Sequence, residues 1–477
     1  MTGGHANDGA PGLERLFDFL PEEGDYQIAP AGRLPAGLRG SYYLNGPCRF
    51  RNGELRYRHW LDGDGMVSAL HFGAGGVRFV GRFVRGKKWC DEEAAGRPLY
   101  RAFGTSFPGD QLKRGIGLES PLNVSVYWWD GKLLAFGEQG LPWELDPLTL
   151  ESRGEYTFGG RLNAISPMSA HAHVDPEAGE LFNFGISFSA RQPSLSVYRI
   201  APGDEIVYRR RIALEWPASV HDFMLGENHL VFYISPYLLE VDKLIGAGAT
   251  PMDALSWQPE RGSRLIVLDR ASGEHLFTVP VAGNYCLHLI NCFEKDGQLA
   301  IDVVELERPV YDQYQVLPDL FQDAPLGGPR RYLIDLAKRE LAGTEQRIAY
   351  RASPDFPAVR PSCLQRDYDD LWMLGMSRAG EPGRKFFDQI VHLRWSRPES
   401  ADLWQAPAGS YLGGEPIFLT DPQSESGWVI CQIIAAENRD SAFLLFDALN
   451  VASGPVARLP LRQPLPACFH ASFHPAV

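Results

Sequence analysis

The sequence predicts an all-β protein, and among all-β folds a β-propeller of about seven blades. Three observations carry this prediction: strand-like segments recur along the whole chain, turn signals separate many of them, and helical patterns are rare. The 49 Gly and 36 Pro residues are spread over all 477 residues rather than clustered, which is typical of short strands joined by many turns.

The strand-like segments either alternate apolar with polar or small residues, or are rich in β-branched and aromatic residues. They are Val77–Val84, Leu181–Ser187, Leu230–Ile234, Leu265–Leu268, Leu299–Val304, Leu371–Leu374 and Val429–Ile434. Turn pairs such as Asp130-Gly131, Ser272-Gly273 and Asp296-Gly297 follow or precede such segments. A chain this long built of hairpins favours a propeller over a sandwich.

Helical patterns are limited to Gly12–Phe19 and Tyr237–Ile245. No linker or low-complexity stretch divides the chain, so we expect a single domain over residues 1–477, with about residues 1–15 flexible.

Composition excludes several classes of protein. The formal net charge of −13, without a long run of Lys or Arg, argues against nucleic acid as a partner. The seven cysteines are scattered and form no CxxC pair, which favours free thiols in a reducing cytoplasm. The chain shows no secretory signal pattern and no apolar run of about 20 residues, so we expect a cytoplasmic protein without a transmembrane segment. A peripheral contact with a membrane stays open.

Four of the 12 histidines follow apolar or small residues at the expected inner ends of strands: His171, His221, His288 and His470. Separations of about 50, 67 and 182 residues exclude a metal site on one helix, but they suit four blades that each send one imidazole towards a central axis. Imidazole binds Fe, Zn, Cu or Ni, so these residues alone do not name the metal.

The contexts of these histidines resemble the four histidine motifs of the carotenoid cleavage oxygenases, a family that also contains stilbene-cleaving and isoeugenol-cleaving enzymes. Three more stretches are similar to motifs of that family: Gly40–Pro47 (GSYYLNGP), His59–Met66 (HWLDGDGM) and Gly137–Glu151 (GEQGLPWELDPLTLE). The resemblance covers nearly the whole chain. It implies a seven-bladed propeller with a helical and loop cap over an Fe(II) ion held by four histidines.

Carried over residue by residue, the resemblance implies that His171, His221, His288 and His470 are the iron ligands, rather than His173. We expect structural roles for His173 and for His474, which lies four residues after His470. It also implies that Glu138, Asp355 and Glu415 orient ligand imidazoles by accepting their second N–H. Asp355 departs from the family, which usually has Glu there, and the shorter side chain makes its reach to His288 a point to test.

Three further positions bear on the substrate. Family members that cleave phenolic stilbenes or phenylpropenes have a Lys and a Tyr that bind the 4-hydroxyl, whereas this chain has Gly137 and Phe103 at the matching positions. Val124 stands where many members place a Thr near the open face of the iron. A pocket built on Gly137 and Phe103 favours an apolar polyene. Val124, the third expected pocket residue, leaves the open face of the iron without a hydroxyl.

The resulting functional prediction is a non-haem Fe(II) dioxygenase that cleaves a conjugated double bond of a carotenoid or apocarotenoid to carbonyl products. Its expected partners are a lipophilic or aromatic small molecule and O2. Three alternatives stay open: cleavage of a stilbene or phenylpropene to aromatic aldehydes, a hydrolytic or isomerising enzyme, and a propeller that only binds partners.

Overall fold

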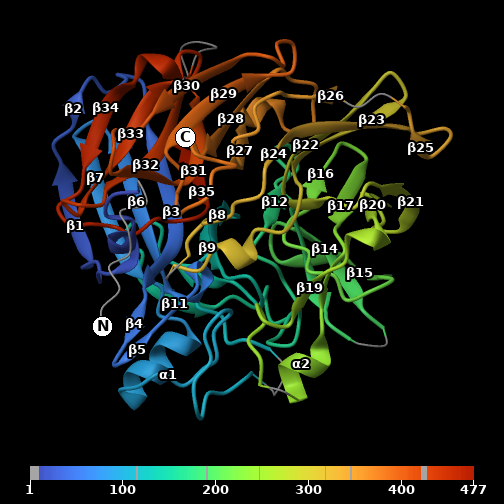
Figure 1. The fold of residues 1–477 in the computed structure, drawn as a ribbon, viewed down its shortest axis with the longest axis horizontal. Helices are drawn as coiled ribbons and strands as arrows, with labels where there is room; N and C mark the ends of the chain where they lie inside the picture. The colour runs from blue at the N-terminus through green and yellow to red at the C-terminus, as the bar shows by residue number, and fades with distance from the viewer. Residues whose placement is uncertain are drawn as a thin grey trace.

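Seven antiparallel sheets of four or five strands follow one another around a common centre and form a seven-bladed β-propeller in the computed structural model (Figure 1). The structure describes residues 10–476 except 114–116, 190–191, 247, 317–318, 344–345 and 421–426. The predicted fold class is confirmed. Of the flexible start that we predicted over about residues 1–15, residues 1–9 lie outside the described residues, whereas Leu13 is buried.

The first and last blades contain strands from both ends of the chain. The first blade has the order β1 (Gly24–Ile28), β7 (Gly76–Phe83), β6 (Asp64–Gly73), β3 (Gly40–Arg49) and β35 (Ala471–Pro475). The last has the order β2 (Ala31–Gly32), β34 (Pro455–Pro460), β33 (Asp440–Asp447), β32 (Gly427–Ala435) and β31 (Ser410–Thr420). Blue and red strands therefore lie side by side in Figure 1, and pairing of β35 with β3 and of β2 with β34 closes the ring.

Five blades between them are each built from consecutive segments of the chain. The second contains β8 (Ser125–Trp129), β9 (Lys132–Phe136), β10 (Trp143–Leu145) and β11 (Ser152–Glu155). The third contains β12 (Ala172–Val174), β13 (Leu181–Ser187), β14 (Ser194–Ala201) and β15 (Glu205–Ala213). The fourth contains β16 (Met224–Leu225), β17 (His229–Ile234), β20 (Ser263–Asp269) and β21 (His275–Val281). The fifth contains β22 (Tyr285–Lys295), β23 (Gln298–Leu306), β24 (Gly327–Asp335), β25 (Glu340–Leu341) and β26 (Gln346–Arg347). The sixth contains β27 (Asp355–Val359), β28 (Asp370–Gly375), β29 (Gln389–Arg394) and β30 (Ala401–Gln405).

Every strand-like segment predicted from the sequence coincides with one of these strands. Leu181–Ser187 matches β13 at both ends, and the others lie within or overlap β7, β17, β20, β23, β28 and β32. Most of these strands have both faces buried against neighbouring blades, which explains their nearly continuous apolar character.

Short helices and small two-stranded sheets lie outside the blades. They are α1 (Lys87–Ala95), α2 (Val241–Gly246), the 3-10 helices η1 (Leu13–Phe17), η2 (Trp60–Asp62), η3 (Pro259–Arg261), η4 (Tyr311–Gln313), η5 (Pro361–Cys363) and η6 (Val451–Ser453), and the pairs β4 (Arg51–Asn52) with β5 (Leu55–Arg56) and β18 (Tyr237–Leu239) with β19 (Leu255–Trp257). Helices α1 and α2 lie on the same side of the molecule in Figure 1.

The helix expected over Tyr237–Ile245 is helical only in its second half, because Tyr237–Leu239 pairs with β19 as a strand. Helix α1 was not predicted. No helix among the described residues is long and apolar enough to cross a membrane.

Candidate metal centre

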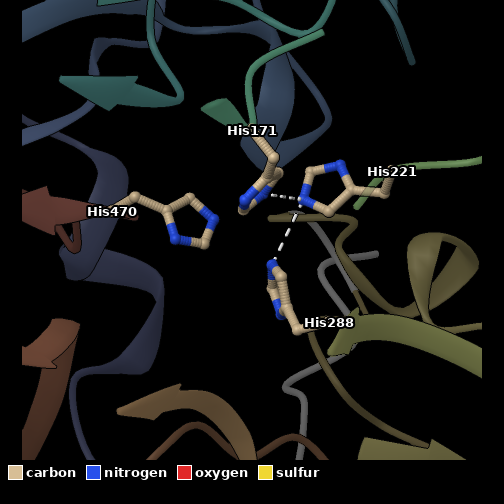
Figure 2. Close-up of side chains that lie close together, drawn as sticks. All are labelled: His171, His221, His288 and His470. Carbon is tan, nitrogen blue, oxygen red and sulfur yellow. Dashed lines mark hydrogen bonds between the residues drawn. The ribbon is translucent and has the colours of Figure 1, made fainter. Parts of the chain in front are cut away.

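Four buried histidines from four different blades converge at the centre of the propeller (Figure 2). His171 directly precedes β12, His221 lies three residues before β16, His288 is in β22 and His470 directly precedes β35. These strands are the inner members of their blades, so each brings its imidazole to the axis. One ring nitrogen from each histidine lies within 4.8 Å of the other three.

The ring nitrogens approach one another in a way that suits a cation. Nε2 of His221 lies 2.9 Å from Nε2 of His171 and 3.2 Å from Nε2 of His288. The Nδ1 atoms of His221 and His288 face carboxylates and therefore carry the ring protons. Their Nε2 atoms then present lone pairs to each other, which repel unless a cation lies between them. The residues thus fit a metal ion.

Each of three histidines has a carboxylate on its Nδ1 side. Glu138 Oε1 lies 2.8 Å from His221 Nδ1, and Asp355 Oδ1 lies 2.5 Å from His288 Nδ1. Glu415 Oε2 lies 3.3 Å from His470 Nδ1. The carboxylates named from the resemblance therefore lie beside the three imidazoles, in the geometry that fixes ring orientation and increases ligand basicity.

The fourth histidine has a carboxylate neighbour that the sequence reasoning missed. Asp222 Oδ1 lies 3.5 Å from His171 Nδ1, and Asp222 Oδ2 accepts a hydrogen bond of 2.8 Å from the backbone N–H of Leu289. Asp222 also lies 3.6 Å from His173 Nε2. Its position next to His221 in the sequence was the only available signal, yet its side chain serves a different histidine.

The protonation of the site follows from burial and charge. Burial holds the pKa of His171 and of His470 well below the ordinary value, so both rings are neutral. Burial also acts to lower the pKa of His221, but Glu138 acts in the opposite direction and raises it above its usual value. Burial raises the pKa of Glu415 to about 8, a shift that a cation at the centre would oppose.

His173 and His474 do not join the cluster. His173 Nε2 lies 2.7 Å from the backbone oxygen of Phe223, and His474 stacks on Trp128 with ring centroids 4.2 Å apart. Both are placed in structural contacts, as the sequence reasoning expected.

A cavity of about 360 Å³ reaches the site at Glu138. Apolar side chains form most of its wall, among them Leu61, Phe103, Ile165, Met168, Ile186 and Leu255. Its charged members include Lys113 and Glu119, whose side chains form an ion pair of 3.2 Å. A second cavity of about 690 Å³ is bordered by His171, His288 and His470.

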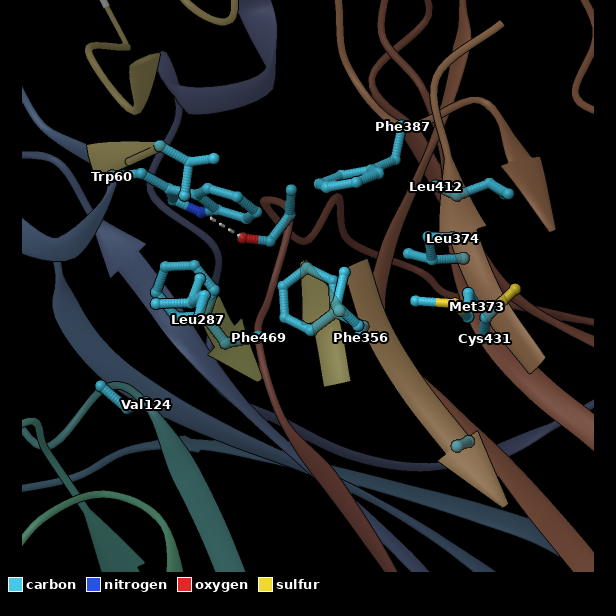
Figure 3. Packing of buried hydrophobic residues seen from close by; sticks show 14 of the residues in the cluster. Trp60, Val124, Leu287, Phe356, Met373, Leu374, Phe387, Leu412, Cys431 and Phe469 are labelled. Carbon is cyan, nitrogen blue, oxygen red and sulfur yellow. Dashed lines mark hydrogen bonds between the residues drawn. The ribbon is translucent and has the colours of Figure 1, made fainter. Parts of the chain in front are cut away.

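The three residues proposed for the substrate pocket have different positions. Phe103 borders the cavity, and its ring packs against His59 and Tyr311, with centroids 4.9 and 5.3 Å away. Val124 is buried in the hydrophobic core (Figure 3), and Gly137 is buried beside the cavity wall. Their neighbours Asn123 and Glu138 border the cavity instead, so a pocket role for Val124 and Gly137 stays a prediction.

Among the described residues, four imidazoles and no carboxylate converge at the centre of the propeller, and this arrangement is a candidate metal site of four histidines. The sequence matches the family described as retinal pigment epithelial membrane protein over residues 17–475. The chain belongs to this family, which includes the carotenoid cleavage oxygenases.

Characterised relatives cover nearly the full length of the chain. It is 28% identical to the apocarotenoid-15,15'-oxygenase of Synechocystis sp., over 96% of this chain and 95% of that protein. It is 30% identical to the isoeugenol monooxygenase of Pseudomonas putida, over 95% of this chain and 96% of that protein. It is 26% identical to the lignostilbene-alpha,beta-dioxygenase isozyme III of Sphingomonas paucimobilis, over 94% of each chain.

A crystal structure of cobalt-substituted Synechocystis apocarotenoid oxygenase superposes with a TM-score of 0.87 at 26% identity, covering 98% of both chains. These findings confirm the predicted family, the propeller, and an oxidoreductase that incorporates O2. At this level of identity the relatives act on different classes of substrate.

Proposed function

We propose that the protein is a non-haem Fe(II) dioxygenase that cleaves a conjugated carbon–carbon double bond of a carotenoid or apocarotenoid. His171, His221, His288 and His470 would hold the iron, which supplies the activation of O2. Four neutral imidazoles leave the divalent charge of the ion uncompensated by its ligands, and the surrounding carboxylates balance it.

The remaining parts of the site orient the ligand imidazoles and shield the reacting double bond from water. Glu138, Asp355 and Glu415 hold the Nδ1 protons of three rings, so that each Nε2 lone pair points to the centre. The apolar wall of the cavity keeps water away from the reacting double bond and selects which bond comes close to the metal.

The observation that carries the polyene proposal is the close approach of Ser120 to Gly137. A Cβ atom on Gly137 would lie 2.1 Å from Ser120 Oγ and 3.1 Å from the backbone nitrogen of Leu122, so a lysine side chain beside Glu138 would require both to move. Phe103 offers no hydroxyl at the position matched to the phenol-binding tyrosine. Because neither of these two phenol donors is present, the cavity suits an apolar polyene better than a phenol.

Parallel incubation of the iron-loaded protein with an apocarotenal and with resveratrol tests this proposal. We expect two carbonyl products from the apocarotenal, each analysed by mass spectrometry for the label from ¹⁸O2. Cleavage of resveratrol alone would refute the polyene preference. Turnover that continues without O2 would instead indicate hydrolysis or isomerisation, and protein purified without bound metal would favour a binding scaffold.

The second candidate is cleavage of a stilbene or phenylpropene. The similarity to isoeugenol and lignostilbene oxygenases favours it, as does Tyr311, which borders the cavity and can provide a hydroxyl at a different position from Phe103. If Tyr311 binds a phenol, Tyr311→Phe will raise the KM for the phenolic substrate and leave the KM for an apocarotenal unchanged.

A further inference from the structure

The substrate cavity adjoins a second space at its outer end, which we call the vestibule. The vestibule has a volume of about 480 Å³. It shares wall residues with the cavity, including Gly117, Gln139, Ile165, Phe188 and Leu244, so the two spaces adjoin. The 67% exposed side chain of Ile165 places this junction at the surface.

Three consecutive arginines on β15 border the vestibule: Arg209, Arg210 and Arg211. All three are exposed, and strand β15 is the outer strand of the third blade. None of them borders the inner cavity, whose wall near the metal centre is mainly apolar. The vestibule therefore has positive charge in its wall, and the adjoining cavity has a mainly apolar wall.

These guanidinium groups have no carboxylate within 4.0 Å among the described residues. Arg209 lies over the ring of Tyr198 at 5.4 Å, and Arg210 lies 5.9 Å from the ring centroid of Tyr208. Arg211 donates through Nε to Ser194 Oγ at 2.8 Å, which leaves its two terminal nitrogens available.

Positive charge on an edge strand discourages pairing with another chain, and this accounts for charge at such positions in general. It does not account for Arg209 and Arg211, which share one face of β15 and border the vestibule beside an apolar cavity. Guanidinium groups bind carboxylates through paired, charge-assisted hydrogen bonds. We propose that Arg209 and Arg211 bind a carboxylate at one end of the substrate while its apolar chain extends into the cavity.

This inference rests on the proposed function for the apolar part of the ligand and adds the chemistry of its outer end. The preferred substrate class is then an amphipathic polyene acid rather than a hydrocarbon carotenoid. The arginines act as specificity residues and take no part in the chemical step.

A binding experiment with ligands that cannot be cleaved tests the inference separately from catalysis. Calorimetric titration of the metal-loaded protein with hexadecanoic acid and with hexadecanol compares a carboxylate with a neutral end on the same chain. We expect the double variant Arg209→Gln/Arg211→Gln to bind the acid about tenfold more weakly and the alcohol unchanged. Loss of affinity for both ligands alike, or for neither, would overturn the inference.

The matched control is Arg33→Gln/Arg462→Gln, which removes the same charge from exposed positions that border none of these spaces. Arg462 lies 4.3 Å above the ring of Tyr26, in a contact like that of Arg209 with Tyr198. This control is expected to bind both ligands as the unchanged protein does. A tenfold loss for the acid in this control would assign the effect to net charge and refute a local site.

Two further measurements are needed. The first distinguishes a substrate carboxylate from a lipid headgroup as the bound anion, and the second distinguishes failure of the carboxylate site from failure of the proposed catalytic function. Vesicles of phosphatidylglycerol test a lipid headgroup: vesicle binding lost in the double variant, with an unchanged ratio of acid to alcohol affinity, would overturn the substrate role. Steady-state kinetics with a polyene acid and its aldehyde should show a raised KM for the acid at constant kcat. If neither polyene is cleaved, the proposed function fails. The calorimetric comparison still shows whether the arginines of the vestibule bind a carboxylate.

Discussion

Asp355 Oδ1 lies 2.5 Å from Nδ1 of His288, so the shorter aspartate reaches the ring where the family usually has glutamate. Ser353 and Phe356, on either side, have positive φ angles of 46° and 55°, and the register of β27 with β28 is irregular from Asp355 to Ala358. Left-handed conformations at non-glycine residues cost about 1–3 kcal/mol each and cluster at functional sites. We interpret this kink as the local change that accommodates aspartate.

Asp355→Asn tests whether the carboxylate orients His288. The amide keeps the size of the side chain but removes the negative charge that accepts the Nδ1 proton, so we expect metal affinity to fall about 10- to 100-fold. Competition with a chelator measures this affinity. Asp370→Asn is the matched control, because Asp370 Oδ1 lies 2.7 Å from Nε2 of His392, outside the cluster. Equal metal affinity in the two variants would show that Asp355 has no orienting role.

The sequence predicted the strands well because strand burial leaves a local pattern. Closure of the propeller leaves no local pattern in the sequence, because β2 and β35 each pair with a blade formed largely from the other end of the chain. Helix α1 was missed because its buried residues are Lys88 and Glu92, an ion pair of 2.9 Å, so the helix has no apolar periodicity. Asp222 was missed for a similar reason, since its partner His171 is distant in sequence.

Only the surrounding sequence motifs distinguished the candidate metal ligands from the other histidines. His171 and His173 provide the clearest test of this distinction. His171 faces the centre, whereas His173 Nε2 lies 2.7 Å from the Phe223 backbone oxygen. We expect His171→Ala to abolish Fe(II) binding and His173→Ala to retain it. Metal analysis gives the stoichiometry, and thermal unfolding with and without Fe(II) gives a second readout. A free metal concentration of 100 times the Kd stabilises the folded state by about 2.7 kcal/mol. The assignment is wrong if both variants lose metal to the same extent.

Gly137→Ala tests the steric relationship that excludes a side chain beside Glu138. The new Cβ would lie 2.1 Å from Ser120 Oγ, so we expect a loss of about 1–3 kcal/mol in the free energy of unfolding. Ser120→Gly removes that hydroxyl, so Ser120→Gly/Gly137→Ala should recover most of the loss. Denaturant unfolding of both single variants and the double variant completes the cycle. Additive effects would mean that the two residues do not compete for this space.

Lys88→Met tests the charged cluster that joins α1 to the first blade. Lys88 Nζ lies 2.8 Å from Asp64 Oδ1, 2.9 Å from Glu92 Oε2 and 3.0 Å from the Tyr57 hydroxyl. Burial acts to lower the pKa of Lys88, but Asp64 and Glu92 outweigh it and raise the pKa above its usual value, so the amine is charged.

Removing Lys88 leaves buried carboxylates without their main cation, and we expect a destabilisation of about 3–5 kcal/mol, measured by denaturant unfolding. Lys87→Met is the control: its side chain is 57% exposed and pairs with Asp91, so its loss should cost about 0–1 kcal/mol. Lys88 also borders the cavity that reaches Glu138. A stable Lys88→Met variant with altered substrate affinity would therefore assign Lys88 to the pocket rather than to the scaffold.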